Sequence, residues 1–262
     1  MTNESDKFLK LIQILKDLRS PNGCDWDKEQ THESLVPYLV EETYEVIEAI
    51  ENKDSKALKE ELGDLILHVL FQAELSSEKG DFDIFDSLDS INNKLVSRHP
   101  HVFDKNSKDD SWNQKGSWEK SKKKEKKRDS VLEGVPKSLP GLLRSRRIQE
   151  RAASVGFDWK EVSPIIDKVE EELNEVKDSI IENNKEQIEL ELGDLLFSIV
   201  NLSRFYNIDP ENALKRSTNK FISRFNEIEK RISESGGSME SSDLETMDKI
   251  WNEVKLDEED NY

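Results

Sequence analysis

Two stretches, EELGDLILHVLF at residues 60–71 and LELGDLLFSIVN at residues 190–201, carry the pattern that decides the fold. Each is an apolar run that contains a glutamate followed three residues later by an aspartate. Residues three apart on an α-helix lie on the same face, so Glu61 and Asp64 are predicted to project together. The second copy repeats this pair 130 residues later, as Glu191 and Asp194.

The apolar residues around these acidic pairs predict helices that are buried on most sides. A glycine inside each motif adds to the expectation of tight packing. Gly63 and Gly193 each cost about 1 kcal/mol relative to alanine in a helix interior. We therefore expect both glycines to lie where two helices approach closely.

A second acidic pattern precedes each motif in the same register. VEETYEVIEAI at residues 40–50 aligns without a gap on EEELNEVKDSI at residues 170–180, again with a shift of 130. The glutamates that align, three residues apart in each copy, are Glu42 and Glu45, and Glu172 and Glu175.

Basic and aromatic residues recur as well. NKLVSR at 93–98 returns as NKFISR at 219–224, and WEKSK at 118–122 returns as WNEVK at 251–255. The recurring side chains are Lys94 and Arg98, Lys220 and Arg224, Trp118 and Lys122, and Trp251 and Lys255. Several features repeated in one order indicate a duplicated unit of about 120 residues.

Helical periodicity covers most of the chain and strand signals are almost absent, which predicts an all-α fold. The helical patterns cover residues 5–19, 33–52, 54–79, 84–98, 142–154, 163–183, 185–206, 210–235 and 243–256. We expect an N-terminal helical unit over residues 1–104 and a C-terminal one over residues 135–262. Between them, residues 105–134 are predicted to form a polar linker region with room for a helix.

The composition limits the partners of the chain. A formal net charge of -18 over 262 residues disfavours nonspecific binding to nucleic acids and anionic membranes, and it favours cations. The basic run KSKKKEKKR at 120–128 is interpreted as a solvated linker or helix face. No apolar run reaches the roughly 18 residues of a transmembrane helix. Cys24 is the only cysteine and the N-terminus has no signal-peptide pattern, so we expect a cytoplasmic protein.

Four carboxylates that converge from two adjacent helices repel one another unless a cation lies among them. Oxygen ligands without histidine or cysteine suit Mg²⁺, with Mn²⁺ as a substitute. The predicted metal ligands are Glu42, Glu45, Glu61 and Asp64 in the first copy, and Glu172, Glu175, Glu191 and Asp194 in the second. The alternative is a pair of solvated acidic faces.

A magnesium ion held by a few carboxylates keeps coordination positions for water and for substrate phosphates. Lys220 and Arg224, one helical turn apart, are candidate phosphate contacts. Lys94 and Arg98 have the same spacing in the first copy. Trp251 and Lys255 would add a stacking ring and a further cation. The alternatives are a solvent-facing basic face and a tryptophan that covers the core.

With these residues in place, the chain resembles the MazG-type nucleoside triphosphate pyrophosphohydrolases of the all-α NTP pyrophosphatase group. The matching segments are LRSPNGCDWDKEQTHESLVPYLVEETYEVIEAI, EELGDLILHVLF and RHPHVF in the first half, and VPKSLPGLLRSRRIQERAASVGFDW, ELGDLLFSIVNLSRF and NKFISRF in the second. Asp25 stands where the family commonly has proline, and Arg147 where it often has lysine.

The resemblance implies Mg²⁺-dependent cleavage between the α and β phosphates of a nucleoside triphosphate, by a homodimer of intertwined helical bundles that serves nucleotide-pool housecleaning. It places catalysis in the C-terminal unit, where one of three carboxylates is expected to take a proton from water: Glu171, Glu172 or Glu175. It also implies that the nucleotide is contacted by Lys220, Arg224, Trp251 and Lys255, with Arg147 as a further cation. Because both copies keep four carboxylates, the sequence leaves open whether the N-terminal unit is catalytic.

Two other functions remain open from the residues themselves. A noncatalytic helical module would use its acidic grooves to bind a cation or a basic partner, without turnover. A phosphohydrolase would use the same metal and carboxylates to release single phosphates. The sequence does not identify the preferred base or sugar.

Overall fold

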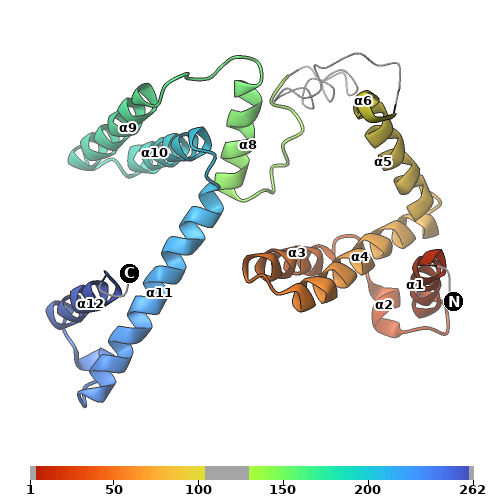
Figure 1. Ribbon diagram of the computed structural model, residues 1–262, viewed down its shortest axis with the longest axis horizontal. Coiled ribbons are helices and arrows are strands. Elements are labelled where there is room, and N and C mark those ends of the chain that lie inside the picture. Colours follow the sequence, from red (N-terminus) through yellow and green to blue (C-terminus); the bar gives the residue numbers. More distant parts are fainter. Residues whose placement is uncertain (1–3, 104–129, 260–262) are drawn as a thin grey trace. The chain divides into compact units, whose positions relative to one another are not determined.

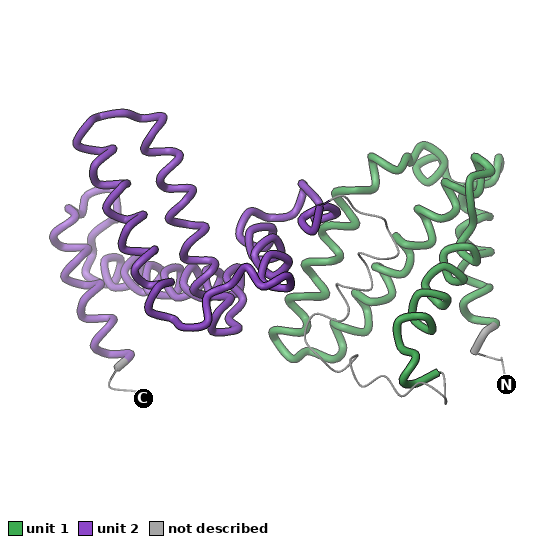
Figure 2. Tube along the Cα trace, turned by 90° about the horizontal axis from the view of Figure 1, so that it is seen from above, with its two compact units in different colours: residues 1–112 green, residues 113–262 purple. Residues whose placement is uncertain are grey.

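The computed structural model describes residues 4–103 and 130–259, which belong to two compact units. Unit 1 comprises residues 1–112 and unit 2 residues 113–262 (Figure 2). Helix is the only regular secondary structure in the described ranges, so the all-α prediction is confirmed. The predicted linker lies largely outside the described residues, as do Trp118, Lys122 and the basic run.

Unit 1 begins with α1 (Glu4–Arg19), which packs on the central helix α4 (Ser55–Glu78). The core between them is built from the apolar side chains Leu15, Leu35, Leu70, Phe71 and Ile84. The remaining helices are α2 (Asp25–Glu29), α3 (Val36–Glu51), α5 (Ile84–Arg98) and α6 (Pro100–Phe103).

Unit 2 contains α8 (Gly141–Ala153), α9 (Ser163–Ile181), α10 (Lys185–Phe205), α11 (Pro210–Glu234), the 3₁₀ turn η2 (Met239–Ser241) and α12 (Leu244–Glu259). Helix α8 packs on α10 and α11, and α12 packs on α11. The long predicted helices are all found within a few residues of their expected ends. The sequence pattern missed α2, α6 and η2, because segments of three to five residues are too short to show a period.

The repeated sequence folds into the same motif in both units, two helices joined by a tight turn. In unit 1 this hairpin is α3 and α4, and in unit 2 it is α9 and α10 (Figure 1). Each turn contains a residue in the left-handed region, Lys53 with φ 55° and Asn183 with φ 54°. These two residues are 130 positions apart, so the internal repeat includes the turn geometry.

The structure corrects the prediction that α4 and α10 are buried on most sides. Within the chain, each packs mainly on its hairpin partner, and the apolar residues on the other side stay in solvent. Leu62 is 44% exposed and Leu196 is 53% exposed. The expected close approach at the glycines is also wrong, because a Cβ at Gly63 or Gly193 would meet no atom within 4 Å.

Among the described residues, no helix combines the length and the apolar character that crossing a membrane requires.

Candidate active site

Each hairpin brings three of its predicted carboxylates together. In unit 2, one carboxylate oxygen from each of Glu172, Glu175 and Glu191 lies within 4.8 Å of the other two. Glu172 and Glu175 are one turn apart on α9, and Glu191 faces them from α10. The equivalent trio in unit 1, with the same limit of 4.8 Å, is Glu42, Glu45 and Glu61.

The fourth predicted carboxylate lies close to each trio. Asp64 is near enough to Glu42 for its charge to help raise the pKa of that glutamate. Asp194 lines the same cavity as Glu172. Both aspartates are themselves exposed. Three of the four predicted carboxylates therefore lie together in each unit, and their role as metal ligands stays a prediction.

These carboxylates oppose one another electrostatically. Burial, followed by the charges of Glu172 and Glu191, raises the pKa of Glu175 above its usual value. Burial and the charge of Glu45 do the same to the pKa of Glu42 and of Glu61. Burial and the neighbouring negative charges both disfavour the charged form of these glutamates, so a bound cation would relieve the repulsion among them.

Glu172 is the most buried member of the unit 2 trio, with a residue exposure of 5%. Its Oε1 forms an ion pair with Lys168 Nζ, and the two atoms are 2.6 Å apart. Its Oε2 is buried and has no hydrogen-bond partner among the described residues. A buried carboxylate oxygen without a donor is costly, which is the expected condition of a metal ligand before metal binding.

The donor set fits a hard divalent cation. Magnesium binds oxygens at about 2.1 Å, so two oxygens in its shell lie about 2.9 to 4.2 Å apart. Carboxylates already within 4.8 Å of one another can reach such a shell by small side-chain rotations. The trio offers only oxygen ligands, which matches the preference of Mg²⁺ or Mn²⁺ rather than zinc.

The surroundings of the two trios differ, and the sequence analysis did not anticipate this. Lys168 lies one turn before Glu171 and Glu172 and forms ion pairs with both, at 3.0 and 2.6 Å. Hydrogen bonds to these two glutamates raise the pKa of Lys168, which therefore remains charged. The spacing of three and four residues between Lys168 and the two glutamates was the available signal in the sequence.

In unit 1, the position 130 residues before Lys168 is Tyr38, which stacks on His68 with ring centroids 6.3 Å apart. His68 Nε2 lies 3.8 Å from a carboxylate oxygen of Glu42. Burial lowers the pKa of His68, so the neutral imidazole is favoured. The unit 1 trio thus has an aromatic neighbour where the unit 2 trio has a permanent cation.

A cavity of about 790 Å³ opens beside the unit 2 trio, and it was also missed by sequence reasoning. Its wall is formed by α8, the segment before α9, α9 itself and α10. Glu172, Asp194 and Lys168 are among the lining residues. The residues of this wall are far apart in the sequence, so no local pattern reveals the cavity.

The predicted phosphate-binding residues of unit 2 lie elsewhere in the same chain. Lys220 and Arg224 are on α11, and none of the predicted phosphate contacts is among the residues that line the cavity. Helix α11 leaves the end of α10 and carries α12 away from α9 (Figure 1). Arg224 donates to Glu258 at 2.6 Å, and its guanidinium lies 5.4 Å from the Trp251 ring centre. Arg224 is therefore held beside the Trp251 ring, and Lys255 follows Trp251 by one turn on α12.

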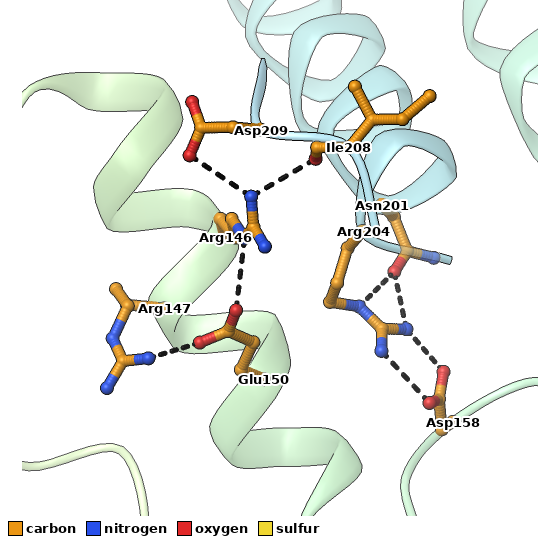
Figure 3. A network of polar contacts seen from close by, with 8 residues as sticks. All are labelled: Arg146, Arg147, Glu150, Asp158, Asn201, Arg204, Ile208 and Asp209. Atoms are coloured by element: carbon orange, nitrogen blue, oxygen red, sulfur yellow. Dashed lines mark hydrogen bonds and ion pairs between the residues drawn. The ribbon is translucent and has the colours of Figure 1, made fainter. Parts of the chain in front are cut away.

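The remaining candidates are less well placed. Arg147, on α8, pairs with Glu150 (Figure 3) and does not line the cavity. In unit 1, Lys94 is exposed on α5, whereas Arg98 is only 6% exposed, so the alternative of a solvent-facing basic face does not describe Arg98.

Comparison with known proteins agrees with this geometry. The family model for the MazG nucleotide pyrophosphohydrolase domain matches residues 30–103 and 161–228, which contain the two carboxylate trios. A nucleoside triphosphate pyrophosphohydrolase/pyrophosphatase MazG of Thermotoga maritima is 47% identical over 250 residues, which cover 95% of both chains. A nucleoside triphosphate pyrophosphohydrolase of Escherichia coli K12 is 43% identical over 98% of this chain and 99% of its own. The chain therefore belongs to the MazG nucleotide pyrophosphohydrolase family.

Proposed function

We propose that this protein hydrolyses nucleoside triphosphates between the α and β phosphates, giving a nucleoside monophosphate and pyrophosphate, with Mg²⁺ as cofactor and Mn²⁺ as a substitute. The observation that carries the proposal is the buried, unpartnered Oε2 of Glu172 within a trio of carboxylates beside a large cavity. The names of the two full-length relatives support the reaction.

Glu172, Glu175, Glu191 and Asp194 would hold the metal. When bound, Mg²⁺ supplies Lewis-acid polarisation of phosphate oxygens and lowers the pKa of a coordinated water. Glu171, Glu172 or Glu175 would accept the proton of the attacking water. Lys168 is held by ion pairs beside the same trio, where it would balance excess negative charge as the phosphates arrive.

The proposal includes a homodimer. The α9–α10 hairpin leaves Leu190, Leu192 and Leu196 between 44% and 58% exposed, and α11 leaves Phe221 54% exposed. Apolar faces of this kind along adjacent helices are typical of surfaces that pack against another chain. The predicted cations of α11 and α12 do not line the cavity beside the carboxylates of their own chain. A second copy would bring its own α11–α12 cations to the first copy's carboxylates.

Phosphorus NMR of the reaction products tests the proposal. Pure protein is incubated with Mg²⁺ and ATP, GTP, CTP or UTP in turn, with an EDTA control. Monophosphate and pyrophosphate, lost on chelation, support the proposal. Orthophosphate with a nucleoside diphosphate would instead indicate the phosphohydrolase that releases single phosphates, and cation binding without turnover would indicate the noncatalytic module.

The variant Glu172→Gln keeps the shape of the side chain but removes its charge, so turnover should be abolished while the helical circular dichroism signal is unchanged. Glu42→Gln is the matched variant in unit 1 and measures whether the N-terminal trio contributes to turnover. Wild-type rates in Glu172→Gln would refute the assignment to unit 2.

The single cysteine favours a reducing compartment, and we place the reaction in the cytoplasm, in nucleotide-pool housecleaning.

A further inference from the structure

We infer that the cavity beside the unit 2 trio binds the base of the nucleotide, with Gln149 accepting a hydrogen bond from a base N–H group. This inference rests on the proposed function and extends it to the part of the substrate that the metal does not touch. The cavity volume of about 790 Å³ is within the range of about 300 to 1,000 Å³ of small-molecule pockets. Glu172 and Asp194 belong to its wall, so phosphates held at the trio would leave the rest of the nucleotide facing the cavity.

Gln149 on α8 presents an acceptor of fixed orientation. Its Nε2 donates to the backbone oxygen of Phe197 at 2.8 Å, which fixes the amide and turns Oε1 the other way. The residue is 7% exposed, and within residues 4–103 and 130–259 its buried Oε1 has no hydrogen-bond partner. Both residues line the cavity. A buried acceptor without a donor is unfavourable, so a small shift of the side chains that cover Oε1 would let it accept from an N–H group of a ligand in the cavity.

A donor lies in the same wall. Asn201 on α10 accepts two hydrogen bonds at Oδ1, from Nε and Nη2 of Arg204 at 3.0 and 2.9 Å (Figure 3). This arrangement leaves the amide Nδ2 of Asn201 as its donating end. Arg204 also forms a two-point ion pair with Asp158, so the charges of this pair balance at the cavity.

The remaining wall suits a flat aromatic ligand. Trp159 and Phe197 are 44% and 43% exposed, and both line the cavity together with Ile148 and Ile165. Enzymes that take up a single base hold it between aromatic or apolar side chains and hydrogen-bond its polar edge. Every nucleobase has a π face and an edge with both an N–H donor and an acceptor, which match Gln149 and Asn201. A purely apolar occupant, such as a side chain of a second copy, would leave the Gln149 acceptor unpaired.

The test separates base binding from phosphate binding. The variant Gln149→Leu removes the acceptor and nearly conserves the volume, and Gln13→Leu, an exposed amide on α1, is the matched control. We measure kcat and KM for ATP, GTP, CTP and UTP, and the inhibition constant of inorganic triphosphate, which has no base. The expected result in Gln149→Leu is a rise in KM of about tenfold for at least one nucleotide, with kcat and the inhibition constant unchanged. An equal rise in KM and in the inhibition constant would overturn the inference, because Gln149 would then act on the metal or the fold. No change in any KM would also overturn it.

A second measurement does not require turnover. Nucleoside monophosphates are titrated in EDTA while tryptophan fluorescence is recorded for wild type, Trp159→Phe and Gln149→Leu. We expect a saturable change in wild type that is lost in Trp159→Phe and is shifted to higher concentration in Gln149→Leu. If the fluorescence changes in this way but no pyrophosphate is released, base binding in the cavity is supported and the proposed reaction is refuted. If pyrophosphate is released but the fluorescence shows no Trp159-dependent change and KM is unaltered in Gln149→Leu, base binding in the cavity is refuted and the proposed reaction is supported.

Discussion

Subunit complementation tests whether the carboxylates of one copy work with the cations of another. One variant is Glu172→Gln, which removes a predicted metal ligand and keeps the α11–α12 cations. The other is the double variant Lys220→Met and Lys255→Met, which keeps the carboxylates. Both lysines are predicted phosphate contacts, and methionine conserves much of their length. Each variant alone should be nearly inactive.

The expected rates follow from the geometry. Hydrogen bonds to charged groups contribute about 1.5 to 3 kcal/mol each, so losing two lysine contacts should lower kcat/KM by about 100-fold to 10,000-fold. In a symmetric dimer whose sites combine α9–α10 of one copy with α11–α12 of the other, a heterodimer of the two variants has one intact site and one doubly defective site. Random mixing makes about half of the dimers heterodimers, so the mixture should regain about a quarter of wild-type activity.

The assay is pyrophosphate release after the two variants are coexpressed with different affinity tags and purified through both. Pure heterodimers should then have about half of the wild-type rate per dimer. Each homodimer, purified in the same way, is the control for background turnover. If the doubly purified heterodimer is no more active than the homodimers, the cations act on the carboxylates of their own chain and the proposed shared site is wrong.

Three further predictions concern stability. Lys168→Met should lower the free energy of unfolding of the metal-free protein by about 1 kcal/mol or less, because Lys168 is 39% exposed. Saturating Mg²⁺ should remove the difference in thermal unfolding, since the ion would take over the charge balance at Glu172. Leu35→Ala empties a fully buried site in unit 1 and should cost about 2 to 5 kcal/mol in urea unfolding; a cost below about 1 kcal/mol would contradict the packing of this core. The ion pair with Arg19 lowers the pKa of Glu78, so its contribution to stability is present above the unfolded pKa and is lost as the pH falls through the lowered value. Glu78→Gln should therefore be less stable than wild type at pH 7, by about 1 kcal/mol or less, and equally stable at a pH below the lowered pKa; a constant difference in chemical denaturation across this range would refute the assignment.

The acidic part of the site was predictable from the sequence because its geometry is local. A spacing of three residues on a helix fixes which side chains share a face, so Glu172 and Glu175 could be paired without a structure. The expectation that the two adjacent helices pack together then placed Glu191 opposite them. The burial of α10 was not predictable in the same way. An apolar helix face indicates that something covers it, but the pattern does not say whether the cover is in the same chain, and Leu196 at 53% exposure shows that here it is not.

The cavity was not predictable because its wall is formed by residues that are far apart in the sequence and meet only in the folded chain. Gln149 and Asn201 come from different helices and carry no spacing relation to each other. Their value as an acceptor and a donor arises only from fixed hydrogen bonds to Phe197 and Arg204. A sequence pattern identifies amides but gives no information on which end of each amide is already occupied.

The two hairpins show how a duplicated site can keep its ligands and still differ in chemistry. A triphosphate brings several negative charges to carboxylates that already repel one another, so a site that binds it needs a nearby cation as well as the metal. Unit 2 has Lys168 in ion-pair contact with Glu172, whereas unit 1 has Tyr38 at the corresponding position and His68 in its neutral form beside Glu42. The same trio of oxygens has a lysine in contact with it in unit 2, and an aromatic ring stands at the corresponding position in the described part of unit 1. This difference, rather than any loss of carboxylates, favours unit 2 as the catalytic one.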